Sequence, residues 1–332
     1  MEPLVSVIMP VRNGGDYLQA AVDSILSQTE QCIELLLVDD HSDDSAIAAL
    51  ECDDPRLLIL ATEGRGVSSA FNTGLAWARG VFFARMDADD IALPERIEAQ
   101  LSYLSQNPGV DICGACVEIF TEGELQGGNR RYQDWLNSCR DPDVIQRELF
   151  IESPIPNPTA MFRRDAQQRL AGYNDPEWPE DYDLYLRADA FGMKMGKPPE
   201  ILLRWREHGD SLTRSDPRYG LEKFQAAKAH YLAHGRLAEV GPVLIWGAGP
   251  TGRLTHDLLQ GEGVEVRGFL EVHPRRIGGT KRGLPVWPFE DLDQHPDEFV
   301  LVAVGAAGAR DKIRNFMQIQ NRQEGKDYLF VA

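Results

Sequence analysis

The sequence predicts an α/β protein of two consecutive domains, each built on a mainly parallel sheet. Segments of strand length alternate with segments of helical periodicity through the first third of the chain, and the alternation starts again at residue 243. The charge composition also changes, because all but one of the 18 net negative charges lie before residue 241. The length of 332 residues fits two domains of ~100–200 residues each.

The first third predicts a parallel sheet that helices cover on both faces. We expect strands over residues 4–11, 34–40, 56–60 and 81–87, and helices over 16–28 and 67–79, the second of them ended by Gly80. The expected strands are almost continuously apolar, which is typical of strands buried on both faces. In the first helix the apolar residues recur at the spacing of one helical face.

The rest of the chain contains a less regular middle section and a second α/β region. Within residues 110–210, three closely spaced prolines precede a helix-like segment over 180–192 and a strand-like segment over 199–206. Residues 222–237 have the pattern of a linking helix. We therefore place the first domain at 1–215, the linking helix within 216–240 and the second domain at 241–332.

Composition excludes several classes of protein. The net charge of −18 argues against nucleic acid as a partner. No uncharged apolar run approaches the ~20 residues of a membrane-spanning helix, and the N-terminus is acidic where a signal peptide would be basic. The five cysteines include one CxxC, Cys113 and Cys116, which lies in an apolar run and reads as core. We expect a soluble cytoplasmic protein, with peripheral contact at the inner face of the membrane left open.

Polar side chains follow three of the expected strands, where ligands of such sheets bind. They are Arg12 and Asn13 after the first strand, Asp39 and Asp40 at the end of the second, and Asp87, Asp89 and Asp90 after the fourth. Carboxylates two residues apart at a strand end can share a hard divalent ion such as Mn²⁺ or Mg²⁺. The alternative is an acidic surface turn, which the buried strand before it disfavours.

These motifs together resemble the family 2 glycosyltransferases of the GT-A fold. The resemblance rests on VSVIMPVRNGGDYLQAAVDSILSQT, LLLVDDHSDD, GVSSAFNTGLAWARGVFFARMDADDIALPERIEAQ, the pair Gly172-Tyr173, PEDYDLYLRADAFG and RWREHGDSLTR, which occur in family order over about residues 4–215. It implies a nucleotide-diphospho-sugar transferase domain, followed here by a small Rossmann-like domain.

The resemblance also implies which residues bind the sugar donor and the metal. The implied donor-binding residues are Pro10, Val11, Arg12, Asn13, Asp39, Arg65, Asn72, Asp87 and Ala88. Asp39 would hold the uracil ring of a UDP-sugar. Asp89 would bind the metal directly, Asp87 would contact the ribose and a metal-bound water, and His208 would complete the site. Arg204, Arg206 and Arg214 would contact the diphosphate or lie in solvent.

The resemblance implies a general base at Asp181, supported by Glu180. An acceptor hydroxyl must lose its proton as it attacks the sugar, and a positioned carboxylate can take it with a gain of ~10²–10⁴-fold. The pair also suits the first turn of a helix, where acids are favoured. Family members often have histidine where this chain has Asn157, which puts any acceptor contact carried over from that position in doubt.

The second domain begins with a glycine-rich turn. Gly247, Gly249 and Gly252 fit G-x-G-x-x-G after an apolar strand, and Glu271 lies 24 residues after Gly247, where an acid would bind a ribose. Pro250 is unusual in that turn. The segment resembles the small module at the front of sugar acyltransferases. A nucleotide site, a ligand-free docking or homo-oligomer face, and NAD binding stay open.

The sequence thus predicts an inverting, metal-dependent glycosyltransferase. It would move a sugar from a nucleotide-diphosphate donor, UDP-linked by the match of Asp39, to a glycan or a lipid-linked acceptor. The alternatives are a sugar nucleotidyltransferase, disfavoured because the N-terminal loop holds one arginine and no lysine, and a non-catalytic nucleotide-sugar-binding protein.

Overall fold

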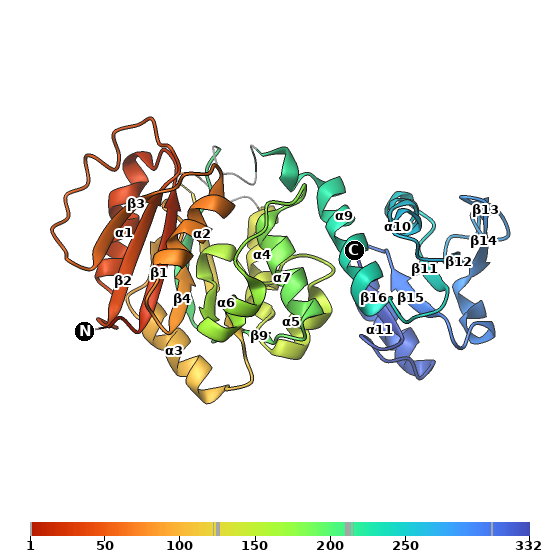
Figure 1. Ribbon diagram of the computed structural model, residues 1–332. Helices are drawn as coiled ribbons and strands as arrows, with labels where there is room; N and C mark the ends of the chain where they lie inside the picture. Colours follow the sequence, from red (N-terminus) through yellow and green to blue (C-terminus); the bar gives the residue numbers. More distant parts are fainter. Residues whose placement is uncertain (1, 122, 124–126, 210–213, 215, 307) are drawn as a thin grey trace. The chain divides into compact units, whose positions relative to one another are not determined.

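The chain divides into two compact units, and one short segment departs from chain order. The computed structural model describes residues 2–332 except 122, 124–126, 210–213, 215 and 307 (Figure 1). The first unit comprises Met1–Ile145 and Pro154–Pro217, and the second comprises Gln146–Ser153 and Arg218–Ala332. The second unit therefore takes eight residues from inside the range of the first, and the expected linking helix is grouped with it.

The first unit is built on a seven-stranded sheet with the order β3-β2-β1-β4-β8-β6-β9. β1 pairs in parallel with β2 and β4, and β2 in parallel with β3, whereas β8 is antiparallel to both of its neighbours. The strands are β1 (Val5–Val11), β2 (Ile33–Asp39), β3 (Leu57–Ala61), β4 (Phe82–Arg85), β6 (Ile112–Cys113), β8 (Met161–Arg163) and β9 (Met195–Gly196).

Helices cover both faces of β1, which explains why its sequence is apolar without alternation. Val7 and Met9 lie in one core cluster with Leu18 of α1 (Leu18–Leu26), while Ile8 points the other way, against Gly74 of α2 (Val67–Trp77). Burial of every β1 side chain makes this strand the centre of the unit's hydrophobic stabilisation.

The irregular middle section forms a small sheet and further helices. The small sheet has the order β5-β10-β7, in which β10 is antiparallel to β5 and parallel to β7. Its strands are β5 (Ile91–Ala92), β7 (Cys116–Phe120) and β10 (Ile201–Arg206). The helices are α3 (Arg96–Gln106), α4 (Gly127–Ser138), α5 (Pro142–Glu148), α6 (Arg164–Leu170) and α7 (Glu180–Ala190). Cys113 and Cys116 are free, buried thiols of the core.

The second unit holds a six-stranded sheet of order β13-β14-β12-β11-β15-β16, parallel except for the β13–β14 hairpin. The strands are β11 (Val243–Trp246), β12 (Val266–Glu271), β13 (Thr280–Lys281), β14 (Leu284–Pro288), β15 (Phe299–Val302) and β16 (Tyr328–Phe330). The helices are α9 (Leu221–Tyr231), a π-helical turn (Leu232–Arg236), α10 (Pro250–Gly261) and α11 (Ala309–Ile319).

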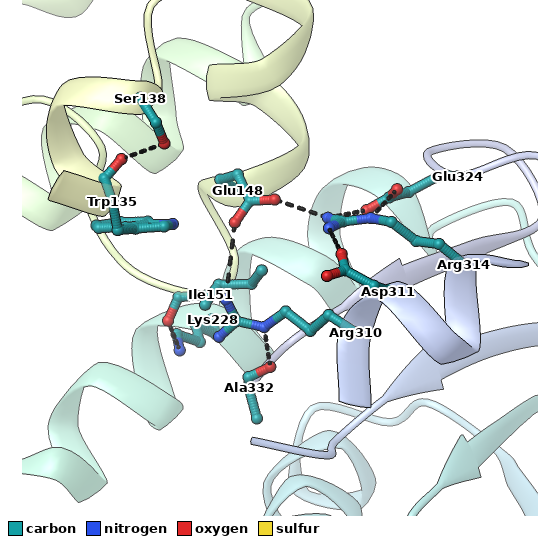
Figure 2. A network of polar contacts seen from close by, with 10 residues as sticks. All are labelled: Trp135, Ser138, Glu148, Ile151, Lys228, Arg310, Asp311, Arg314, Glu324 and Ala332. Atoms are coloured by element: carbon teal, nitrogen blue, oxygen red, sulfur yellow. Dashed lines mark hydrogen bonds and ion pairs between the residues drawn. The ribbon is translucent and has the colours of Figure 1, made fainter. Parts of the chain in front are cut away.

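The segment Gln146–Ser153 is fixed to the second unit by polar and apolar contacts. Figure 2 shows Glu148 beside Arg314, 2.7 Å apart, and Lys228 donating a hydrogen bond of 2.7 Å to the carbonyl of Ile151. The side chain of Ile151 belongs to the same core cluster as Leu244 of β11. The segment is therefore part of the second unit's core.

Several element ends differ from the predicted ones. α2 ends at Trp77, three residues before Gly80, because Ala78 adopts an extended conformation. Gly80 instead lies against β1: a Cβ there would come within 2.5 Å of the backbone nitrogen of Ser6. β4 ends at Arg85, two residues before Asp87, so the acidic motif lies wholly in the loop. In the part of the chain that the structure describes, no helix has the length and apolar character needed to cross a membrane.

Candidate active site

The candidate active site lies where the parallel strands of the first unit end. β1 lies between β2 and β4 in the sheet. The chain runs from the end of β1 toward β2 at one edge, and from the end of β4 toward the strands at the other edge. Such a switch point opens a crevice for ligands. The register pairs Val11 of β1 with Asp39 of β2, and Met86 after β4 donates its backbone N–H to Ile8. These pairings bring the three predicted strand-end motifs to one rim.

Three carboxylates meet after β4 and could hold a cation. One ligand oxygen each from Asp87, Asp89 and Asp90 lies within 4.8 Å of the others. Asp90 is 1% exposed; its Oδ1 accepts a hydrogen bond from the backbone N–H of Arg206, at 2.7 Å. Its buried Oδ2 has no hydrogen-bond partner among the described residues. A buried carboxylate oxygen without a donor fits a hard divalent ion.

The electrostatics of these carboxylates also favour a cation. Burial, together with the charges of Asp89 and Glu180, raises the pKa of Asp87 to about 6, although Arg85 lies 2.5 Å from it and opposes the shift. Burial and the two neighbouring aspartates raise the pKa of Asp90 well above its ordinary value. A bound divalent ion would offset this mutual repulsion.

Two cationic side chains that were not predicted from the sequence support the cluster from inside the core. The guanidinium of Arg85 is buried and donates to the carbonyl of Met86 at 2.6 Å. Arg96, fully buried, donates to the carbonyl of Arg85 at 2.6 Å, and its charge opposes the raised pKa of Asp87 and Asp90. Arg85 ends an otherwise apolar strand and Arg96 begins α3, but the spacing of neither residue marks it as a partner of the acidic motif.

The structure places His208 beside the acidic motif. Its Nε2 lies 2.8 Å from Oδ2 of Asp89, and its ring lies 5.4 Å from that of Tyr17. Arg206 donates to the backbone carbonyl of Asp89 at 2.7 Å, and its guanidinium lies over the ring of Tyr17. Arg204 forms an ion pair with Glu118, and Arg214 forms one with Glu207, rather than with the aspartates of the motif. Residues 210–213 of the motif lie outside the described residues.

Glu180 and Asp181 occupy the first turn of α7, as predicted. Glu180 is 1% exposed, and its charge contributes to the raised pKa of Asp87, so this turn lies within electrostatic reach of the acidic motif. Asp181 is half-buried, and its Oδ1 accepts a hydrogen bond of 2.7 Å from the N–H of Tyr182. The hydrogen bond from Tyr182 therefore fixes the orientation of the Asp181 carboxylate at the start of the helix.

A buried network joins α2 to the segment before α7. The side-chain amide of Asn72 donates to the carbonyl of Tyr173 at 2.8 Å and accepts from its N–H at 2.9 Å. The hydroxyl of Tyr173 donates to Oδ1 of Asn157 at 2.5 Å, and that of Tyr185 donates to the same oxygen at 3.3 Å. Asn157, where the family often has histidine, thus accepts two tyrosine hydroxyls. The side chain of Asn72 thus binds the backbone of Tyr173, and the network fixes the loop that precedes Asp181.

The predicted donor-binding residues of β1 and β2 divide into buried and accessible ones. The side chains of Pro10 and Val11 are buried, which leaves only their backbone to face a ligand. Arg12 and Asn13 are exposed, and Asn13, with a φ of 56°, accepts from the N–H of Asp43. Asp39 accepts from Ser42 at 2.9 Å.

Arg65 and Asn72 line an open pocket of about 520 Å³ that the acidic motif does not enter. The pocket is bounded by Arg65, Ser68, Ser69, Asn72, Thr73, Ala76, Tyr173 and Asp175. Asp40, which is buried, accepts the N–H of Gly66 at 2.9 Å and fixes the loop that carries Arg65. Ala88 is half-buried between the two aspartates of the motif.

Side chains of the second unit already form hydrogen bonds at its glycine-rich turn. Gly247 has a φ of 114°, and a Cβ on Gly252 would meet the carbonyl oxygen of Gly247 at 1.8 Å, so both positions require glycine. Glu271 ends β12 as predicted, but its carboxylate already accepts from the N–H of Ala248 and from Arg276, at 3.3 and 3.0 Å. A ribose would have to compete with these donors.

The comparisons identify the family. The model described as Glycosyl transferase family 2 matches residues 6–170. An uncharacterized glycosyltransferase from Haemophilus influenzae is 32% identical over 68% of this chain and 71% of its own. One from Rickettsia typhi is 34% identical over 84% of this chain and 86% of its own, so that alignment extends into the second unit. An O-antigen biosynthesis glycosyltransferase of Escherichia coli is 29% identical over 65% and 84%. The chain belongs to the family 2 glycosyltransferases and is a glycosyltransferase enzyme.

A solved structure supports the fold. The first 349 residues of TarS from S. aureus, in complex with UDP-GlcNAc, superpose with a TM-score of 0.57 at 17% identity, over 70% of this chain and 67% of that one. The first unit therefore has the GT-A fold.

Proposed function

We propose that the chain transfers a sugar from a nucleotide-diphosphate donor, UDP-linked, to a glycan or lipid-linked acceptor, with inversion at the anomeric carbon and with Mn²⁺ or Mg²⁺ as cofactor. The observation that carries the proposal is the set of three carboxylates after β4, with a buried oxygen of Asp90 left without a donor among the described residues. The family generally uses a divalent metal ion. Similarity to an O-antigen biosynthesis enzyme supports a glycan as the product.

Asp87, Asp89, Asp90 and His208 are the residues that would hold the cation, which supplies charge stabilisation of the departing diphosphate. Asp39, at the end of β2, would accept hydrogen bonds from the base of the donor. Arg12, exposed after β1, would contact the nucleotide of the donor. We leave the glycine turn of the second unit outside this reaction.

Asp181 takes the proton in the proposed reaction. The acceptor oxygen forms a bond to the anomeric carbon, the bond from that carbon to the diphosphate oxygen breaks, and the acceptor proton passes to the carboxylate of Asp181. Glu180 is buried in the same turn, and the hydrogen bond from Tyr185 of α7 to Asn157 helps to hold the helix in place. A rigid base is required because misplacement of a reacting group by ~1 Å can cost ~10²-fold in rate.

The test is a panel of nucleotide sugars with Mn²⁺ or Mg²⁺, read as release of nucleoside diphosphate. Wild-type protein should hydrolyse or transfer from at least one UDP-sugar, and Asp89→Asn should lose metal-stimulated turnover. Asp53→Asn, an exposed aspartate of the same unit, is the matched control. Undiminished turnover in chelator would refute metal dependence. Pyrophosphate release from a nucleoside triphosphate and a sugar 1-phosphate would instead indicate a nucleotidyltransferase.

A further inference from the structure

A second cluster of metal-ligating side chains lies in the second unit, outside the acidic motif. His230, near the end of α9, and His234, in the π-helical turn that follows, are four residues apart and face the same way. Their ring centroids are 4.5 Å apart, with an angle of 36° between the ring planes. Glu262, the residue that follows α10, lies opposite both rings.

The spacing of the three side chains fits a tetrahedral ion. Oε2 of Glu262 lies 3.4 Å from Nδ1 of His230 and 3.6 Å from Nδ1 of His234. An ion with tetrahedral bonds of ~2.0–2.2 Å to nitrogen and oxygen separates neighbouring ligand atoms by ~3.4 Å. One ligand atom from each residue lies within 4.8 Å of the other two. Small side-chain rotations would bring all three within bonding distance of one ion.

The chemistry of the donors selects the kind of ion. Two imidazoles and one carboxylate suit zinc, copper and nickel, whereas Mg²⁺ and Ca²⁺ prefer oxygen ligands. The side chains are 37%, 59% and 30% exposed, so water can reach the remaining coordination position. We propose that His230, His234 and Glu262 form a transition-metal site, with zinc as its ion, that joins α9 and the π-helical turn to α10.

The site would act as a clamp inside the second unit. The ring nitrogen Nδ1 of His234 lies 2.9 Å from the carbonyl oxygen of His230. This contact is a hydrogen bond when Nδ1 carries the proton. Metal bound at Nδ1 replaces that proton and exchanges a contact within one helix for a link between two. α10 begins at the glycine turn, so the ion would stabilise the helix that packs on this turn.

The test uses the full, untagged chain carrying Asp89→Asn, in excess Mg²⁺, so that the acidic motif does not contribute zinc binding. Zinc titrated against a chromophoric chelator should show one ion per chain. His234→Gln and Glu262→Gln should each weaken zinc binding by about 10–100-fold or more. Even loss of a residue that only hydrogen-bonds to a metal ligand has an effect of that size. Co²⁺ should give the intense visible absorption of a four-coordinate ion, and both variants should lose it.

His273→Gln, an exposed histidine of the same unit, is the matched control and should bind zinc as the parent does. Far-UV circular dichroism checks that each variant is folded, and two variants on different elements keep the test decisive if one misfolds. Zinc affinity that is equal in the parent, His234→Gln and Glu262→Gln would overturn the proposal. So would absence of zinc uptake by the folded parent, which would leave the cluster as ion pairs only.

Discussion

Asp181 is held by its own helix, which is what a general base requires. We predict that Asp181→Asn folds and binds the UDP-sugar donor like wild type but loses transfer by ~10²-fold or more, because the amide cannot take the acceptor proton. Single-turnover transfer and calorimetric donor binding measure the two effects separately. Asp165→Asn, another acid in the first turn of a helix in the same unit, should keep full turnover. Near wild-type transfer by Asp181→Asn would remove Asp181 from the mechanism.

Asp90 is almost fully buried, and its Oδ2 has no hydrogen-bond partner among the described residues. Its raised pKa indicates that burial disfavours the charged form. We therefore predict that Asp90→Asn changes the unfolding free energy of the metal-free chain by no more than about 1 kcal/mol, a small effect for a buried site. The same variant should lose the upward shift in melting temperature that Mn²⁺ gives wild type. Thermal melts with and without Mn²⁺ decide, and an equal metal shift in both proteins would contradict the prediction.

The strand-end carboxylates could be predicted from sequence because each follows an apolar run, and parallel strands present their carboxyl ends at one edge. Arg85 and Arg96 could not, because their role depends on packing beneath the motif rather than on spacing. The same holds for the link between Asn72 and Tyr173, which are 101 residues apart in the chain.

Among the elements, the connection from α2 to β4 depends on one close approach. Ser6, buried in β1, accepts from the N–H of Gly80 at 2.8 Å and donates to Glu34 at 2.6 Å. A Cβ on residue 80 would press on the backbone of β1, which cannot move without disturbing the sheet. We predict that Gly80→Ala lowers the unfolding free energy by about 1–3 kcal/mol. Denaturant melts should show no such loss for Gly109→Ala, where the space is open.

Lys228 of α9 gives the second unit a pH dependence. Burial lowers the pKa of Lys228 to about 8, with Glu152 opposing the shift. Between pH 8 and the ordinary lysine value of ~10.4, the unfolded chain holds a proton that the folded chain has released, so stability rises with pH in this window. Wild type should therefore gain stability relative to Lys228→Met as pH rises from 8 to 10. Lys312→Met, exposed on α11, should follow wild type; a constant difference for Lys228→Met would contradict the assignment.

Element type followed from periodicity more reliably than element ends did. The predicted strands of the first third match β1 to β4 within about two residues at each end, because buried apolar runs define them. α2 ends where Ala78 becomes extended, and the expected linking helix is divided into α9 and a π-helical turn; neither change has a signal in the local periodicity. In the three-stranded sheet, β10 pairs with β5 and β7, which lie more than 80 residues away in the chain. A local sequence pattern cannot indicate such a pairing.

At the scale of the whole molecule, every residue of the proposed transfer reaction lies in the first unit. We predict that a fragment ending near residue 235 binds the UDP-sugar within about 3-fold of the full chain, but melts lower and aggregates. Ile151 would lose its core neighbours, and Phe150 would lose Arg236, whose guanidinium lies over its ring. Replacing both with serine should restore solubility. Calorimetry and sedimentation measure binding and association, including any loss of a homo-oligomer. Folded fragments that do not bind the donor would show that the boundary is wrong.

The placement of Gln146–Ser153 has a consequence for synthesis on the ribosome. The first unit needs residues up to 217, but the apolar side chains of this segment wait for β16, which pairs with β15 only after residue 330 is made. At about 5–20 residues per second, the ribosome leaves Ile151 uncovered for roughly 10–35 s after it is added. The first unit is complete only after residue 217, so during the last ~6–23 s of this interval a complete catalytic unit carries an exposed apolar segment on a nascent chain, which is the kind of surface that chaperones bind.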